Sequence, residues 1–151
     1  MQLDFGVCLA PFQSAAPNVS QGAVETLNPV LADVVELIQD LETLGFHSAW
    51  IDEHTFSPAS LTLSPELLIA AAAPSTRTIG LGALTCLHHD HPLILAERLV
   101  QLDHLTGGRL TICARPAPLN PGAQMMGVNH TRQRDRMNEA LEVLVPLLRD
   151  E

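Results

Sequence analysis

Short apolar runs and longer stretches with helical spacing alternate along the whole chain. The short runs have the length and composition of buried strands. They cover residues 3–10, 46–51, 78–87 and 109–114. After each run, apolar residues recur at the spacing of one helix face. These helical stretches cover residues 29–44, 67–73, 92–105 and 133–148. The pattern predicts four strand–helix units of about 30 residues each.

Residues at the ends of the helical stretches support this interpretation. Gly45 follows the first stretch, where glycine can adopt the left-handed conformation that ends a helix. Ser64 and Pro65 precede the second stretch as an N-cap and a proline at the first helical position. Residues 13–28 are rich in Ser, Pro, Asn and Ala, so we expect a long loop there. Pro146 should bend the last turn of the fourth helix.

The order of the units predicts the fold class but leaves the closure of the sheet open. A strand followed by a helix, repeated along the chain, is typical of an α/β protein in which helices connect neighbouring parallel strands. Four such units form either half of a (β/α)8 TIM-type barrel or a small open sheet with helices on one or both faces. Periodicity does not separate these alternatives. A half-barrel would leave its first and fourth strands as open edges.

The composition is that of one globular domain covering residues 1–151. Hydrophobic residues make up 46% of the chain and charged residues 17%, a balance that supports a buried core. Acidic residues outnumber basic ones 17 to 8, and every basic residue is Arg. Without a Lys-rich surface to neutralise phosphates, we expect no nucleic-acid partner.

The sequence also bears on the compartment. No apolar run approaches the length of a membrane span, and no basic segment opens the chain. The three cysteines, Cys8, Cys86 and Cys113, are odd in number and lie in apolar stretches, which favours reduced thiols. We therefore expect a cytoplasmic protein with no membrane association.

Two polar clusters are candidates for chemistry. Glu53 and His54 follow the second predicted strand directly, which places an acid and an imidazole at the carboxyl end of that strand. Imidazole titrates near neutral pH and can donate or accept a proton; the alternative is a strand-end histidine held by Glu53. The second cluster, residues 88–91, reads His-His-Asp-His. Its spacing is that of a loop and no second ligand pair appears, so we expect no metal site and interpret it as the loop before a helix.

Three elements of the sequence resemble the luciferase-like family of flavin-dependent monooxygenases. The first is Leu-Gly-Phe-His-Ser-Ala-Trp-Ile-Asp-Glu-His at 44–54. The second begins with Ser-Pro-Glu-Leu at 64–67 and continues to Gly-Arg at 108–109 in the family's order and spacing. The third, Met-Met-Gly at 125–127 followed by Gln-Arg at 133–134, resembles the branch that includes limonene 1,2-monooxygenase. The resemblance covers essentially the whole chain.

The resemblance implies a fold, a cofactor and a reaction. Members are eight-stranded barrels that bind reduced FMN, or sometimes a deazaflavin, at the carboxyl ends of the strands. They use O2 to oxidise a small organic substrate, and a separate flavin reductase is an expected partner. The implied catalytic residues are His54 and Glu53. The implied cofactor-binding residues are Thr85, Cys86, Arg115 and Pro116.

The chain departs from the family in three ways. Complete members are more than twice as long, so this chain corresponds to a truncated, N-terminal half-barrel. Relatives carry a second histidine where this chain has Thr55. Relatives in the nearest branch have Gly-Pro-Gly where residues 115–117 read Arg-Pro-Ala, and the added side chains would take up space that glycine leaves to the flavin. Arg115 would contact an anion there or be a solvated loop residue.

Two functions are consistent with these observations. The chain is either part of a flavin monooxygenase or a non-catalytic half-barrel that pairs with itself or with a full-length relative through its open edges. The second interpretation predicts a homo-oligomer or a mixed assembly. The substrate is not readable, because selectivity in such barrels depends largely on loops.

Overall fold

A computed structural model describes residues 3–10, 23–53, 64–87, 90–116, 127 and 129–149. Its centre is a four-stranded parallel sheet in the order β1-β2-β3-β4. The strands are β1 (Gly6–Leu9), β2 (Ser48–Asp52), β3 (Gly80–Thr85) and β4 (Leu110–Ala114). Each strand therefore pairs with the next strand along the chain.

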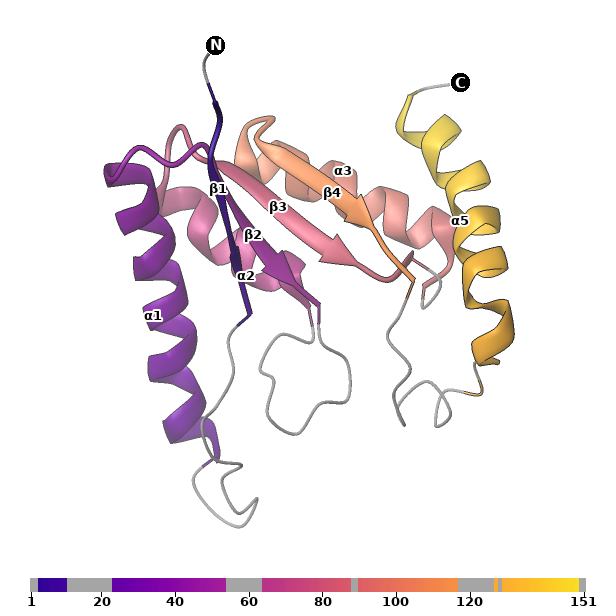
Figure 1. Ribbon diagram of the computed structural model, residues 1–151, viewed down its shortest axis with the longest axis horizontal. Coiled ribbons are helices and arrows are strands. Elements are labelled where there is room, and N and C mark those ends of the chain that lie inside the picture. The colour runs from indigo at the N-terminus through magenta and orange to yellow at the C-terminus, as the bar shows by residue number, and fades with distance from the viewer. Residues whose placement is uncertain are drawn as a thin grey trace.

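Helices connect the strands and lie on one side of the sheet (Figure 1). They are α1 (Ala23–Thr43), α2 (Pro65–Ala72) with the short helix η1 (Ala73–Ser75), α3 (Pro92–Thr106), and α5 (Gln133–Leu148) preceded by η3 (His130–Arg132). A doubly wound sheet would reverse its strand order and carry helices on both faces. The sequential order and one-sided helices instead belong to a segment of a (β/α)8 barrel, which confirms the predicted fold class.

Alternation along the strands divides their side chains between two faces of the sheet. One set packs against α1 and α2 and forms the larger buried cluster. Its strand residues include Leu9, Ala49, Ile51, Leu81 and Ala83. Its helix residues include Val34, Ile38, Leu41, Leu68 and Ile69. A second cluster joins α3 to α5 through Leu95, Leu99, Ala140 and Leu144. No described helix covers the opposite face of the sheet, which we call the open face.

The structure corrects some predicted boundaries. Helix α1 begins at Ala23, whereas residues 13–28 were expected to form a loop. Ala, Glu and Leu in residues 23–27 are good helix formers, and Pro29 removes one backbone hydrogen bond without ending the helix. The rest of the expected loop, 11–22, lies outside the described residues. Ser64 occupies the N-cap position of α2, but its side chain makes no capping hydrogen bond.

Two charged side chains fix the loops at the amino ends of the strands. The Glu42 carboxylate accepts the backbone N–H groups of Arg77 at 2.9 Å, Thr78 at 2.5 Å and Ile79 at 2.9 Å. These bonds lower the pKa of Glu42 to about 2. The Arg109 guanidinium donates to the Thr106 carbonyl at 2.7 Å. It also donates to Thr76 Oγ1 and to the carbonyls of Ile79 and Ala73.

Candidate functional site

The four parallel strands end at one edge of the sheet, which we call the carboxyl edge (Figure 1). In open and closed α/β sheets this edge is where ligands bind. Glu53, Thr85, Cys86 and Arg115 all lie there, immediately at or after the ends of β2, β3 and β4. The structure thus brings together four of the six residues that the sequence indicated.

Glu53 joins the ends of β2 and β3. Its side chain is buried, and Oε2 accepts a hydrogen bond from the Thr85 hydroxyl at 2.6 Å and from the Cys86 backbone N–H at 2.8 Å. Its own N–H donates to the Leu84 carbonyl at 3.0 Å. A buried carboxylate costs free energy unless donors compensate its lost hydration, and here the last residue of β3 and the residue after it each supply one donor. The assignment of Glu53 as catalytic stays a prediction.

Arg115 crosses the end of β3 to reach β2. Its backbone N–H donates to the Thr85 carbonyl at 3.0 Å, and its Nη2 lies 2.6 Å from Asp52 Oδ1. Nη2 also donates to the backbone carbonyl of Glu53. The two paired side chains are only 23% and 19% exposed, so Arg115 is not a solvated loop residue. Its Nε is buried and has no hydrogen-bond acceptor among the described residues.

The thiol of Cys86, the cysteine at the carboxyl edge, is buried. Burial raises the pKa of Cys86 to about 12, and the nearby Glu53 carboxylate raises it further, although Arg115 opposes the shift. The pKa of Cys8 is also raised, first by burial and then by Asp52. Because the thiolate is the nucleophilic form, both shifts disfavour reaction of these cysteines as nucleophiles. The Cys86 backbone N–H, rather than its sulfur, is the group engaged in the site.

Trp50 lies on the open face of β2, two residues before Asp52. Its indole N–H donates to Ser48 Oγ at 3.0 Å. A Cβ on Gly82, its neighbour on β3, would lie 2.3 Å from the indole ring. The ring therefore lies against the backbone of β3. Sequence analysis assigned no role to Trp50 or Asp52, although the period of two along a strand places both on one face.

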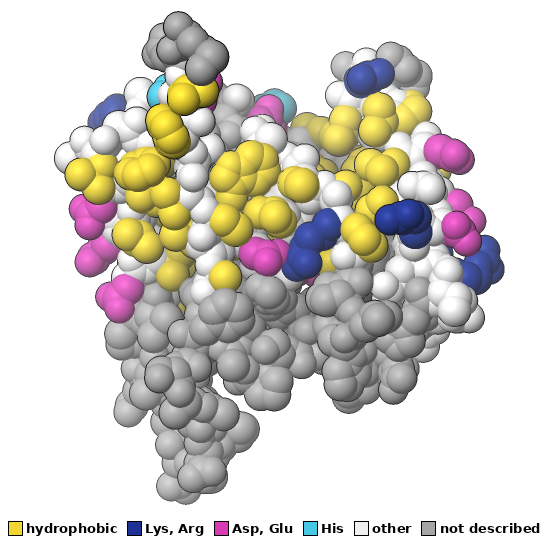
Figure 2. Space-filling model, viewed as in Figure 1, with side chains coloured by type: hydrophobic (Ala, Val, Ile, Leu, Met, Phe, Trp, Pro, Cys, Tyr) yellow, Lys and Arg dark blue, Asp and Glu magenta, His cyan; other side chains and the backbone are white. Residues whose placement is uncertain are grey.

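The open face carries mixed apolar and charged groups. Figure 2 looks onto it and shows hydrophobic side chains over the strands, with an acidic and a basic group side by side toward the carboxyl edge. Residues on alternate strand positions of this face are Cys8, Trp50, Asp52, Leu84, Thr111 and Cys113. Apart from the Asp52–Arg115 pair, this lining offers no charge to a ligand among the described residues.

Some of the remaining residues that the sequence indicated lie outside the described ranges, and the others can be placed in the fold. His54, His88 and His89 lie outside the described residues. Pro116 is exposed directly after Arg115. His91 is the N-cap of α3, and its Nδ1 accepts the Leu93 N–H at 3.3 Å. The interpretation of residues 88–91 as the loop before a helix is confirmed at this residue. In the described ranges, no three side chains of the metal-ligating types lie close enough to hold a metal ion.

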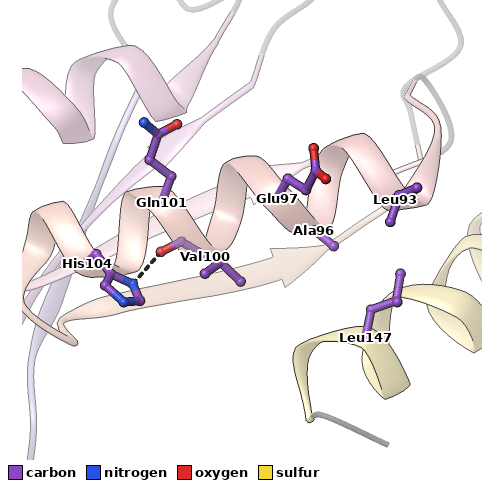
Figure 3. Close-up of a pocket in the computed structure, with 7 residues that line it drawn as sticks. All are labelled: Leu93, Ala96, Glu97, Val100, Gln101, His104 and Leu147. Atoms are coloured by element: carbon purple, nitrogen blue, oxygen red, sulfur yellow. Dashed lines mark hydrogen bonds between the residues drawn. The ribbon is translucent and has the colours of Figure 1, made fainter.

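A hollow lies in the helix layer, away from the carboxyl edge. It has a volume of about 550 Å3 and lies between α3 and the end of α5 (Figure 3). Its lining residues are Leu93, Ala96, Glu97, Val100, Gln101, His104 and Leu147. The His104 ring contacts the Val100 carbonyl of its own helix through Nδ1 at 2.9 Å. The hollow shares no residue with the carboxyl edge, so it is separate from the candidate site.

Among the helices that the structure describes, none has the length and apolar character needed to cross a bilayer.

Comparison with known proteins shows several relatives. Limonene 1,2-monooxygenase of Rhodococcus erythropolis is 37% identical over 151 residues, which is 99% of this chain and 37% of the relative. The 4-hydroxyprotoasukamycin monooxygenase of Streptomyces nodosus subsp. asukaensis is 38% identical over 115 residues, or 76% of this chain and 31% of the relative. The chain therefore spans less than half the length of either relative.

Solved structures agree on the fold. The oxygenating constituent of 3,6-diketocamphane monooxygenase from Pseudomonas putida, in complex with FMN, superposes with a TM-score of 0.82 at 23% identity and covers 95% of this chain and 39% of that one. RslO1 from Streptomyces bottropensis gives a TM-score of 0.80 at 25% identity, with 95% and 42% coverage. A family model described as luciferase-like monooxygenase matches residues 3–151. This match and the identity to the two monooxygenases show that the chain belongs to the luciferase-like monooxygenase family.

Proposed function

We propose that the chain is the N-terminal half-barrel of a flavin-dependent monooxygenase that uses reduced FMN and O2 to oxidise a small organic substrate. The observation that carries this proposal is the convergence of Glu53, Thr85, Cys86 and Arg115 at the carboxyl edge. Membership of the luciferase-like family supports the reaction class. FMN is the cofactor we propose, with a deazaflavin as the alternative.

One feature of the carboxyl edge, the Arg115 guanidinium, fits an anionic cofactor. Arg115 carries a buried Nε that has no acceptor among the described residues, and such an orphaned donor is stabilised by a ligand oxygen. Its Nη2 is already held by Asp52 and by the Glu53 carbonyl, so the guanidinium would keep its position when a ligand binds. When bound, reduced flavin supplies the electrons that activate O2 for transfer of one oxygen atom.

The other residues of the site have supporting roles. Glu53 fixes the end of β2 against β3 through the Thr85 hydroxyl and the Cys86 N–H. A fixed end of β2 matters because a proton-transfer group must be held within hydrogen-bond reach of the reacting atoms. His54, the next residue in the chain, is the group that we propose holds or moves this proton. Pro116 would limit the backbone beside Arg115 through its fixed φ.

The wider setting follows from the same proposal. The chain would form one half-barrel domain over residues 1–151, act in the cytoplasm and take reduced flavin from a separate reductase. Neither nucleic acid nor a membrane is expected as a partner. A small hydrophobic substrate is consistent with the apolar side chains of the open face, where the two charges among the described residues, Asp52 and Arg115, are paired with each other.

A second candidate function is pairing between half-barrels. Within the described sheet, β1 and β4 each pair with one neighbour only, so each leaves a row of backbone groups open to another strand. Leu3 and Phe5, just before β1, are 57% and 61% exposed. Pairing with a second copy or with a full-length relative would cover these groups. Sedimentation velocity tests this candidate, and a stable monomer at high concentration would contradict it.

Titration with FMN, oxidised and reduced, tests the first proposal. We expect saturable binding that His54→Ala and Arg115→Ala both weaken, with binding of the reduced form affected at least as much. His104→Ala is the matched control, because His104 belongs to the hollow between α3 and α5. Folded protein that binds neither form of FMN would contradict the proposal for this chain.

A further inference from the structure

We propose that two copies of this chain close one eight-stranded barrel, in which β1 of each copy adds to the free edge of β4 of the other. The docking surface is this free edge together with an apolar hollow beside it, and its occupant is the β1 segment of a second copy. The inference deepens the second candidate function, pairing between half-barrels, and rests on it.

An apolar hollow of about 510 Å3 lies on the helix side of β4. Leu110 and Ile112 of β4 line it on one side, and Leu147 and Leu148 of α5 line it on another. Figure 1 shows α5 standing apart from β4 at its carboxyl-terminal end. Leu147 and Leu148 are 40% and 43% exposed, so an apolar side chain that enters the hollow would remove apolar surface from water.

The segment that fits this hollow lies at the other free edge of the sheet. Leu3, Phe5, Val7 and Leu9 occupy alternate positions along β1 and the residues before it, so their side chains share one side of the sheet. Val7 and Leu9 pack into the core on the helix side. Leu3 and Phe5 continue the same row but are largely exposed to solvent. The chain thus has an uncovered apolar row at one edge and an apolar hollow at the other.

Both edges also present free backbone groups. Arg109 and Arg115 bond to β3 through their main chains. Because the backbone groups of successive residues point to opposite sides of a strand, the alternate residues between them turn theirs toward the free edge. These residues are Leu110, Ile112 and Ala114. At the other edge, the Phe5 carbonyl accepts the His47 N–H at 2.8 Å, which leaves the alternate residues of that segment facing outward. These residues are Asp4, Gly6 and Cys8.

Closure of the barrel sets the register between the two edges. Each copy supplies four strands, and around an eight-stranded barrel the strands are displaced by about eight residues in total. Twofold symmetry therefore assigns about four residues to each junction between the copies. Strand partners lead from Val7 across β2 and β3 to Leu110. Right-handed twist and right-handed crossovers direct the displacement toward the amino ends of the strands, so Leu3 of the second copy lies opposite Leu110.

Two features that played no part in setting this register agree with it. First, Phe5 of the second copy lies opposite Ile112, so the exposed Leu3 and Phe5 both meet the residues that line the hollow. Second, a residue of a parallel pair bonds to the two neighbours of the residue opposite it. Leu110 turns its backbone groups toward the second copy, and the neighbour Asp4 turns its own toward Leu110.

The closed barrel also brings both copies together at the carboxyl edge. The same register places Cys8 of the second copy opposite Arg115. Each candidate site is then bordered by β1 of the other copy, so the site belongs to the dimer rather than to one chain.

Sedimentation velocity of the full chain tests the docking surface. We expect the wild type to form a dimer, and Phe5→Asp to raise its dissociation constant at least about a hundredfold, because two unpaired carboxylates would enter apolar hollows. Leu67→Asp is the matched control, since Leu67 is 73% exposed on α2 and lies in the helix layer. A monomeric wild type would overturn the proposal. So would a dimer that Leu67→Asp weakens as much as Phe5→Asp does.

Disulfide formation between the copies tests the register. Two chains whose native cysteines are replaced by Ala carry Ile112→Cys with either Phe5→Cys or Val7→Cys. Opposite Cα atoms of neighbouring strands lie about 4.8 Å apart, and a shift of two residues lengthens this distance to about 8 Å, beyond the reach of a disulfide. With oxidised glutathione, we expect the Phe5→Cys chain to form covalent dimers and the Val7→Cys chain to form few. The reverse result would overturn the register.

The proposal and the candidate function on which it rests fail separately. A monomeric wild type would remove both the pairing between half-barrels and the closed barrel. A dimer that forms the Val7→Cys cross-link instead would retain pairing through the sheet edges and remove the closed barrel.

Discussion

The two edges of the sheet each contain a glutamate and an arginine that accept or donate several hydrogen bonds. The two edges differ in whether every hydrogen-bonding group of these side chains has a partner. At the amino edge, Glu42 accepts three backbone N–H groups and a hydroxyl, and Arg109 donates to four oxygens. At the carboxyl edge, Glu53 is buried beneath an Arg115 whose Nε lacks an acceptor among the described residues. Saturated charges hold loops in place, whereas the Arg115 guanidinium keeps one buried donor without a hydrogen-bond acceptor among the described residues.

The largest expected effect is that of Arg109→Ala on stability. The variant loses the four hydrogen bonds that join the residue before β4 to η1, to the end of α3 and to the residues before β3. Because three of the acceptors are backbone carbonyls in a half-buried position, the free energy of unfolding should fall by about 3 kcal/mol. Urea denaturation followed by circular dichroism measures this. Arg109→Lys should recover only part of the loss, since an ammonium group cannot reproduce the fork of donors.

Glu42→Ala should have the next largest effect, about 2 kcal/mol, because three backbone N–H groups lose their acceptor. The pH dependence follows from the lowered pKa of about 2. A carboxyl group whose pKa is lower in the folded state stabilises the fold above its unfolded pKa, near 4.5, and this contribution disappears as the pH falls toward 2. Glu42→Gln should therefore flatten the loss of stability between these two pH values. An unchanged acid profile would contradict the assignment.

Arg115→Ala should lower stability less, by about 1 kcal/mol, because it removes one partly exposed ion pair and one carbonyl bond. Its main effect should be on ligand binding at the carboxyl edge. Comparing the unfolding free energies of the Arg109 and Arg115 variants in the same buffer tests the contrast between the edges. A greater loss of stability for Arg115→Ala would mean that both arginines are structural.

The smallest expected effect concerns thiol reactivity and leaves stability unchanged. Cys86 should react with iodoacetamide at pH 8 far more slowly than exposed Cys113, because its pKa of about 12 and its burial keep the sulfur protonated and covered. Mass spectrometry of the modified peptides gives the two rates. Similar rates would show that the carboxyl edge opens in solution.

Sequence patterns predicted the elements better than the contacts between them. The limits of α5 agree with the periodic stretch 133–148 because a helix is encoded by neighbours along the chain. The predicted start of α1 was wrong because the prediction relied on the loop-like composition of residues 13–28 and gave too little weight to the helix propensity of residues 23–28. The pairing of Asp52 with Arg115 joins residues from β2 and from the end of β4. No local pattern encodes such a contact, and only the register of the folded sheet reveals it.

The functional roles of the candidate site residues stay predictions, and the contacts among these residues could not be predicted from the sequence. Resemblance to the family indicated Glu53 and Arg115, whereas the hydrogen bonds from Thr85 and Cys86 to Glu53 required the structure. The position of Trp50 over Gly82 was missed for a similar reason. A glycine in a strand signals close approach of another group, but it does not say which side chain approaches.

The agreement between strand order and chain order has a consequence for synthesis on the ribosome. Each strand finds its partner in the unit made just before it, so no pairing in the described sheet waits for a distant segment, and the contact order of the sheet stays low for a parallel fold. The chain can therefore add one strand and one helix at a time as it emerges, with β4 as the growing edge.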